Sequence, residues 1–93
     1  MMSNKNVILA FLNEEQAKSL SLFSTGDKLF SYNTCIAEWL TSDTILININ
    51  KYSVTTSKHL TLLRNNIKNQ YSCIEINKQI DRGTQSLIQF LSV

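Results

Sequence analysis

The most constraining feature of this sequence is a regular alternation of isoleucine that follows a short polar break. In the segment TILININ, residues 44–50, every second residue is isoleucine, which is the pattern of a half-buried β-strand. The polar residues Thr41–Asp43 precede it and supply a turn. An aromatic-rich segment, residues 29–40, comes before that turn. We therefore predict a β-hairpin over residues 29–49.

The first strand of this hairpin has apolar side chains on both of its faces. Residues 29–40 read LFSYNTCIAEWL, so neither alternating set is polar throughout. A strand of this kind is either covered on both sides or carries a β-bulge that switches its faces. Both alternatives fit the sequence, and Asn33 is the expected position of the bulge.

The N-terminal quarter is predicted to add further strands. Residues 6–12 (NVILAFL) are rich in β-formers and predict a strand. Residues 13–23 are ambiguous, because Asn13 followed by Gln16 resembles a helix capping box. We favour a turn over residues 13–16 followed by a strand. The segment STGDK, residues 24–28, then predicts another turn.

The second half of the chain predicts two helices and one more strand. Leu60, Leu63 and Ile67 form an apolar stripe at helical spacing, which predicts a helix near residues 57–69. Residues 71–77 predict a strand, and the spacing of apolar residues predicts a C-terminal helix near residues 83–92. The expected architecture is a single α+β domain over residues 1–93, with a small antiparallel sheet of about four or five strands and helices against one face.

The composition favours a globular protein over a dedicated DNA-binding or membrane-spanning one. A hydrophobic fraction of 43% and a charged fraction of 17% are typical of a globular chain. The formal net charge of +2 is small for a dedicated duplex-binding protein. The run VILAFL is far shorter than the roughly 20 residues that span a bilayer. Cys35 and Cys73 lie in apolar runs and are expected to be buried free thiols, so we predict a cytoplasmic protein.

The start of the predicted helix has an unusual set of polar residues. The segment KYSVTTSKHL carries hydroxyls at Thr55, Thr56 and Ser57, followed by Lys58 and His59. A helix start with free N–H groups and a nearby cation favours an anion such as phosphate. The same hydroxyls equally well cap the helix. Both alternatives remain open at this point.

The sequence offers little for catalysis. His59 is the single histidine, and the chain contains no CxxC or HExxH motif, so we predict no metal, no cofactor and no catalytic residue. Cys35 and His59 are conceivable as a nucleophile and its base, but a cysteine among apolar neighbours is typical of an inert thiol. We therefore expect a protein that is not an enzyme.

Aromatic residues form the third candidate site. Tyr32, Trp39 and Tyr52, together with Phe30, would stack bases if they faced solvent. Trp and Tyr are also frequent anchors of protein–protein interfaces. Core packing is the alternative for each of these residues.

The segments LFSYNTCIAEW and TILININKYSVTTSKHL are similar to a small domain of unknown function found in phage and mobile-element proteins. The resemblance covers roughly residues 29–66. The residues that match its pattern are Ser31, Tyr32, Thr34, Ile36, Ala37, Tyr52, Ser53, Thr55, Thr56, Ser57, Lys58 and His59. It implies a small α+β domain of phage origin and no particular chemistry.

Two functions follow as expectations from this combination. The first is a non-enzymatic protein that binds and inhibits a host protein or ribonucleoprotein, in the manner of anti-defence proteins such as anti-CRISPR proteins. The alternative is an accessory or regulatory nucleic-acid-binding protein that uses residues 55–59 and the sheet aromatics. A homodimer through an exposed strand edge is also conceivable.

Overall fold

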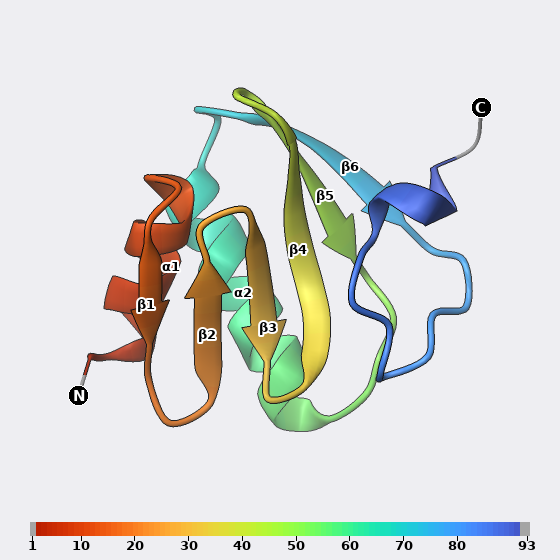
Figure 1. The fold of residues 1–93 in the computed structure, drawn as a ribbon, viewed down its shortest axis with the longest axis horizontal. Helices are drawn as coiled ribbons and strands as arrows, with labels where there is room; N and C mark the ends of the chain where they lie inside the picture. Colours follow the sequence, from red (N-terminus) through yellow and green to blue (C-terminus); the bar gives the residue numbers. More distant parts are fainter. Residues whose placement is uncertain (1, 92–93) are drawn as a thin grey trace.

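A six-stranded mixed sheet with two α-helices on one face forms the body of the protein (Figure 1). The computed structural model describes residues 2–91. The predicted α+β class is confirmed, with a sheet slightly larger than expected. In chain order the elements are α1 (Asn4–Leu12), β1 (Gln16–Lys18), β2 (Leu22–Thr25), β3 (Lys28–Ser31), β4 (Thr34–Thr41), β5 (Thr44–Asn48), α2 (Val54–Ile67), β6 (Ser72–Ile76) and the 3₁₀ turn η1 (Ile88–Phe90).

The strands lie in the sheet in the order of the sequence. Strands β1 to β5 form an antiparallel meander, and the predicted hairpin between β4 and β5 is confirmed by the pairing of Trp39 with Ile45. β6 pairs with β5 in parallel, so the expectation of a purely antiparallel sheet is wrong. The reason is α2, which carries the chain back across the sheet before β6 begins, as a crossover helix does in a βαβ unit.

The predicted strand over residues 29–40 is in fact two strands. β3 ends at Ser31 and β4 begins at Thr34, so Tyr32 and Asn33 form a two-residue hairpin turn. Tyr32 adopts a positive φ of 55°, which such tight hairpin turns require. The register shift lies between Leu29 and Phe30 rather than at Asn33. The alternative of cover on both sides is correct, because hydrophobic clusters lie on both faces of the sheet.

The N-terminal apolar run is a helix, so the predicted strand over residues 6–12 is wrong. Ser3 caps α1, with its hydroxyl accepting a hydrogen bond from the N–H of Asn6. Val7, Ile8 and Phe11 are fully buried against the sheet. A nearly continuous apolar run fits a buried helix as well as a strand, which explains the error. The turn after it is confirmed, and the following strand is interrupted at residues 19–21 to give β1 and β2.

α2 begins earlier than predicted. It spans Val54–Ile67 rather than residues 57–69, and Ser53 is its N-cap. Leu60, Leu63 and Ile67 are buried against the sheet, as the apolar stripe predicts. α2 and α1 lie on the same face of the sheet (Figure 1).

The predicted C-terminal helix over residues 83–92 is not formed within the described part, which ends at residue 91. η1 is the only helical turn there. This segment instead crosses the outer face of the sheet (Figure 1), where Leu87 is buried with Phe30 and Leu46. The carboxylate of Glu38 accepts the N–H of Leu87 at 2.6 Å and the hydroxyl of Ser86 at 3.0 Å. These tertiary bonds replace the intrahelical bonds of the predicted helix.

The two cysteines are both free thiols, as predicted, but only one of them is buried. Cys35 lies in the core of the outer face, and burial raises the pKa of its thiol to about 12. Cys73 is exposed, because β6 is an edge strand. Among residues 2–91, no helix is both long and apolar enough to cross a membrane.

Candidate functional site

The hydroxyls at the start of α2 are engaged within the fold to different degrees. The hydroxyl of Ser53 accepts the N–H of Thr56 at 3.1 Å, so the helix does begin with a side-chain cap. The capping role expected of the hydroxyls of residues 55–57 is wrong, because these residues lie inside α2. Thr56 is buried, Ser57 is half-buried, and Thr55 and Lys58 are exposed. The five residues of this predicted group therefore do not form one open surface.

His59 is buried and lies at the centre of a polar network. Its Nδ1 atom is 2.7 Å from the hydroxyl of Ser31, which is itself 3.0 Å from the hydroxyl of Thr56. On the other side of the ring, Nε2 is 3.2 Å from the hydroxyl of Ser21 and 3.4 Å from the amide nitrogen of Asn4. The network therefore joins α1, the β1–β2 loop, β3 and α2.

The contacts favour one tautomer of this histidine. The amide nitrogen of Asn4 faces Nε2 and only donates, which favours a proton on Nδ1, where it would donate to Ser31. Burial lowers the pKa of His59 below its usual value of 6.5. A second proton would place an N–H on Nε2 against the donor of Asn4. The ring is therefore neutral at neutral pH and serves to connect segments.

A serine next to a histidine invites comparison with a catalytic pair. Here the hydroxyl of Ser31 is sealed from solvent, and a nucleophile must reach its substrate. Cys35 and His59, the other conceivable pair, do not meet, since His59 is bonded on the helix-covered side and Cys35 packs in the outer cluster. Within residues 2–91, no group of three or more metal-ligating side chains occurs.

The aromatic residues that the sequence singled out have separate environments. Trp39 is buried, and its indole N–H donates to the carbonyl of Phe11 at 2.9 Å. Tyr52 is half-buried; its hydroxyl accepts from the amide of Asn48 and donates to the carbonyl of Ile80. Tyr32 is exposed, and the centroid of its ring lies 6.3 Å from the centroid of the His59 ring. Of these three residues, Tyr32 is the one that is exposed.

One end of the molecule gathers three exposed apolar side chains. The β1–β2 loop, the β3–β4 turn and the start of α2 lie at this end (Figure 1). We call it the loop end and define it as residues 19–21, residues 32–33 and residues 51–57. Leu20 is 84% exposed, Tyr32 59% and Val54 74%. Residues 18–23 and residues 32–33 enclose a hollow of about 340 Å³ at this end.

Of these three residues, the sequence pattern indicates Tyr32 but neither Leu20 nor Val54. Both are ordinary apolar residues beside polar ones, and either is equally compatible with a core position. The available signal was local: Leu20 lies between two serines, and Val54 follows the residue that caps the helix. Neither position belongs to an apolar stripe.

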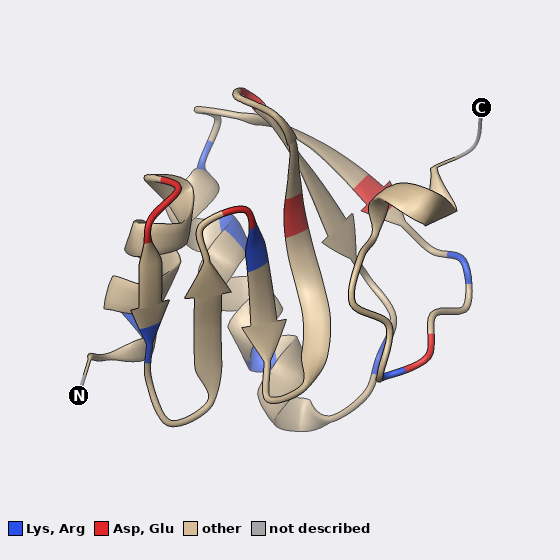
Figure 2. Cartoon of the chain, viewed as in Figure 1, with Lys and Arg blue, Asp and Glu red and all other residues tan. Residues whose placement is uncertain are grey.

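The loop end is also cationic. Lys18 lines its hollow, and Lys51 lies beside Val54 in a second shallow depression. Among the described residues that line these two depressions, none is acidic. Figure 2 shows acidic segments towards the opposite end, in the α1–β1, β2–β3 and β4–β5 connections, and others on β4, on β6 and in the segment after β6.

These features define a small α+β domain whose mixed sheet is covered by helices on one face and by its C-terminal segment on the other. The model of a family of unknown function, DUF8033, matches residues 1–82, and the chain belongs to that family. No curated protein and no solved structure matches the chain.

Proposed function

We propose that this chain is a non-enzymatic binding protein that engages a protein partner through the loop end. The observation that carries the proposal is the exposed set Leu20, Tyr32 and Val54 at one end of the molecule. Ser21 and Ser31, the chain neighbours of Leu20 and Tyr32, are bonded to the buried His59. Exposed apolar side chains at one end of a folded domain fit an interaction site, and tyrosine is frequent among the residues that dominate binding energy.

The backbone of Tyr32 supports a role in binding. A positive φ is uncommon for a residue with a side chain, and it is unfavourable for a large one. At 55°, Tyr32 occupies a position where glycine or asparagine is preferred. A tyrosine that is both strained and exposed contributes little to stability, so its presence favours a function.

The resemblance to phage and mobile-element domains suggests the kind of partner. We propose a host protein or ribonucleoprotein in the cytoplasm, whose activity the protein inhibits as an anti-defence factor, an anti-CRISPR protein for example. The lysines at the loop end favour an acidic surface on that partner.

The same lysines favour nucleic acid as a second candidate. Lys18, Lys51 and Lys58 are exposed around the loop end, where a phosphate backbone would contact them. Base stacking has less support, because Trp39 and Phe30 are buried and Tyr52 is bonded to the segment after β6. A protein partner is therefore the better supported of the two.

A pull-down of the tagged protein from host lysate, with and without nuclease, tests the proposal. The proposal expects a defined partner that survives nuclease and is lost with the double variant Leu20→Ser, Tyr32→Ala. The matched control is Leu9→Ser, which removes an exposed apolar side chain from α1. A partner lost on nuclease treatment supports the nucleic-acid candidate. Equal retention by the double variant and the wild type contradicts the loop end as the site.

A titration with the purified partner would then measure the effect. We expect Tyr32→Ala alone to weaken binding by about fivefold or more, since hot-spot residues typically cost more than 1 kcal/mol on truncation. The same titration at two salt concentrations separates the candidates further. Binding to nucleic acid weakens steeply with salt, by roughly one unit of logarithmic slope for each phosphate contact.

A further inference from the structure

The outer edge of β6 has backbone groups that point away from the sheet. Ser72 donates its N–H to the carbonyl of Asp43, and the carbonyl of Ile76 accepts from Ile49. Alternate residues of a strand point their backbone groups to opposite sides, so Cys73 and Glu75 direct theirs outward. Within residues 2–91, no other backbone group bonds to the outward groups of these two residues.

This edge lacks the usual protection against pairing with another strand. Proteins commonly protect such edges with proline, lysine, a bulge or a very short strand. Residues 72–76 contain neither proline nor lysine, and their register with β5 is continuous. Ile74 is 40% exposed on the outer face of the sheet. The opposite edge differs, because β1 is only three residues long and ends in Lys18.

We propose that a second copy of this chain pairs with β6 in antiparallel orientation. The twofold axis that relates the copies passes between their two Ile74 residues. In this register Cys73 of each copy lies opposite Glu75 of the other, and each such pair exchanges two N–H···O bonds. The outward groups of Cys73 and Glu75 are placed symmetrically about Ile74, so every one of them gains a partner. Ile74 meets Ile74 across the axis, which buries the exposed apolar side chain.

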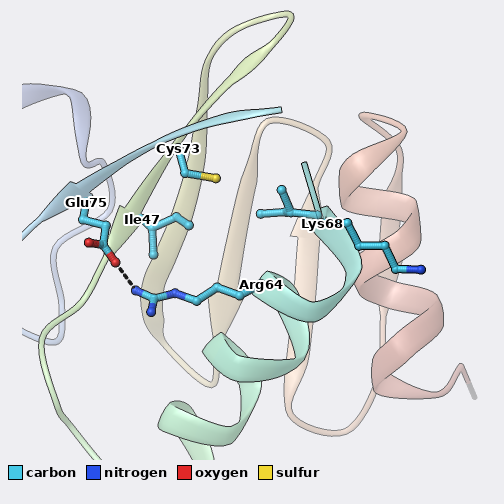
Figure 3. Close-up of a pocket in the computed structure, with 6 residues that line it drawn as sticks. Ile47, Arg64, Lys68, Cys73 and Glu75 are labelled. Carbon is cyan, nitrogen blue, oxygen red and sulfur yellow. Dashed lines mark hydrogen bonds and ion pairs between the residues drawn. The ribbon is translucent and has the colours of Figure 1, made fainter. Parts of the chain in front are cut away.

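On the outer face Ile74 shares a hollow with Phe90 and Leu91 of the C-terminal segment. On the α2 side, the charges around the axis are compatible with the pairing. Figure 3 shows Cys73 and Glu75 projecting from β6 towards the side of α2, where Glu75 forms an ion pair with Arg64. No charged residue of the strand faces itself, because Glu75 lies opposite Cys73. The pairing also leaves the loop end uncovered, since β6 lies away from that end (Figure 1). The dimer is therefore independent of the proposed binding function.

The molar mass in solution tests the dimer directly. We expect the wild type to sediment as a dimer and Ile74→Lys as a monomer, because two like charges then meet at the axis. Val54→Lys is the matched control: it changes an exposed apolar residue at the loop end and should leave the dimer intact. The far-ultraviolet circular dichroism spectrum of each variant verifies that it is folded. A monomer mass for the wild type at about 1 mM, the weak end of specific association, would overturn the proposal.

Cys73 provides a second test that uses the native chain. In the proposed register the two Cys73 residues are diagonal neighbours, with a separation of roughly 7–8 Å. A bis-maleimide with a short spacer should therefore crosslink the wild type, but neither Cys73→Ser nor Ile74→Lys. Crosslinking that persists in Cys73→Ser, or a dimer unaffected by Ile74→Lys, places the contact elsewhere and contradicts the β6 pairing.

Discussion

At the scale of single residues, His59 connects segments that are far apart in the sequence. Its ring nitrogens face Ser31 on β3 on one side and both Ser21 and Asn4 on the other. The sequence resemblance includes Ser31, Thr56 and His59, and these three side chains form one chain of hydrogen bonds. These three residues therefore have a structural role, because their bonds connect β3 with the start of α2 at the loop end.

The lowered pKa of His59 predicts a pH-dependent stability. Its folded pKa lies below the unfolded value of 6.5, so the unfolded chain takes up the proton first as the pH falls. The free energy of unfolding is therefore at its full value above about pH 7 and decreases as the pH falls through about 6.5. Urea unfolding of the wild type at about pH 7.5 and 5.5 measures the decrease.

The matched variant for this prediction is His59→Gln. It is expected to be less stable at both pH values, because it weakens the network, but to lose the difference between them. His59 is the single histidine of the chain, so no other side chain ordinarily titrates in this window. Equal stability of the wild type at the two pH values would contradict a lowered pKa.

Residue-level prediction from the sequence was limited by distance along the chain. A side-chain cap at the start of the helix was predictable, because a cap depends on local spacing, but the cap is Ser53 and not the hydroxyls of residues 55–57. The contacts of His59 with Ser31 and Asn4 join residues 28 and 55 positions apart. No local pattern identifies such partners, and the same reason explains why Tyr52 was not predicted to bind the carbonyl of Ile80.

At the scale of elements, two apolar segments were assigned the wrong secondary structure. Residues 6–12 form a helix because Ser3 caps them and one face of the run, which includes Val7, Ile8 and Phe11, packs in the core. The C-terminal segment has apolar residues at helical spacing, yet Leu87 packs on the sheet while Glu38 binds its N–H. In both cases the spacing of apolar residues fits two backbone conformations, and tertiary contacts determine which of them forms. The β4–β5 hairpin and the stripe of α2 were predictable because their periods are unambiguous.

The start of α2 provides a sharp element-level prediction. Ser53→Ala removes the side-chain acceptor for the N–H of Thr56 and should lower the free energy of unfolding by about 1 kcal/mol. Ser57→Ala, at the start expected from the sequence, lies inside the helix and should change it by less than about 0.5 kcal/mol. Chemical denaturation of both variants compares them directly. A larger loss for Ser57→Ala would place the N-cap where the sequence had predicted it.

The segment that follows β6 depends on Tyr52. Tyr52→Phe keeps the ring but removes the hydroxyl that bonds to Asn48 and Ile80. We expect faster tryptic cleavage after Lys78 and Arg82, because local opening of this segment becomes easier. Tyr71→Phe is the control, since Tyr71 packs its ring against Trp39 at the other end of β6. Equal cleavage rates for Tyr52→Phe and the control would show that the hydroxyl does not hold the segment.

At the scale of the whole molecule, the sheet separates two hydrophobic clusters. One contains the residues beneath α1 and α2, and the other lies beneath the C-terminal segment and includes Cys35. Burial of its thiol raises the pKa of Cys35 to about 12, so very little reactive thiolate is present at neutral pH. The rate at which Cys35 is labelled therefore reports how often the outer cluster opens, whereas Cys73 is exposed in the native state.

This difference predicts the thiol reactivity of the folded protein. Cys73 is exposed, although partial burial also raises the pKa of its thiol, and it should react with a maleimide in the native state. Cys35, followed in a Cys73→Ser background, should react only as the molecule unfolds. Destabilising that background with Ser53→Ala should speed the labelling of Cys35 by roughly fivefold for each 1 kcal/mol lost. Mass spectrometry of timed samples measures both rates. Labelling of Cys35 at the rate of Cys73 would contradict a sealed outer cluster.

The parallel pairing of β6 with β5 has a consequence for synthesis on the ribosome. A nascent chain that ends before Ser72 already contains β1 to β5 and most of its apolar residues. Until α2 and β6 have been synthesised, β5 is an apolar strand without a partner on one side. Translation therefore includes an interval in which an unpaired strand edge of the unfinished chain is open to association, and this interval ends only after residues 72–76 have been made.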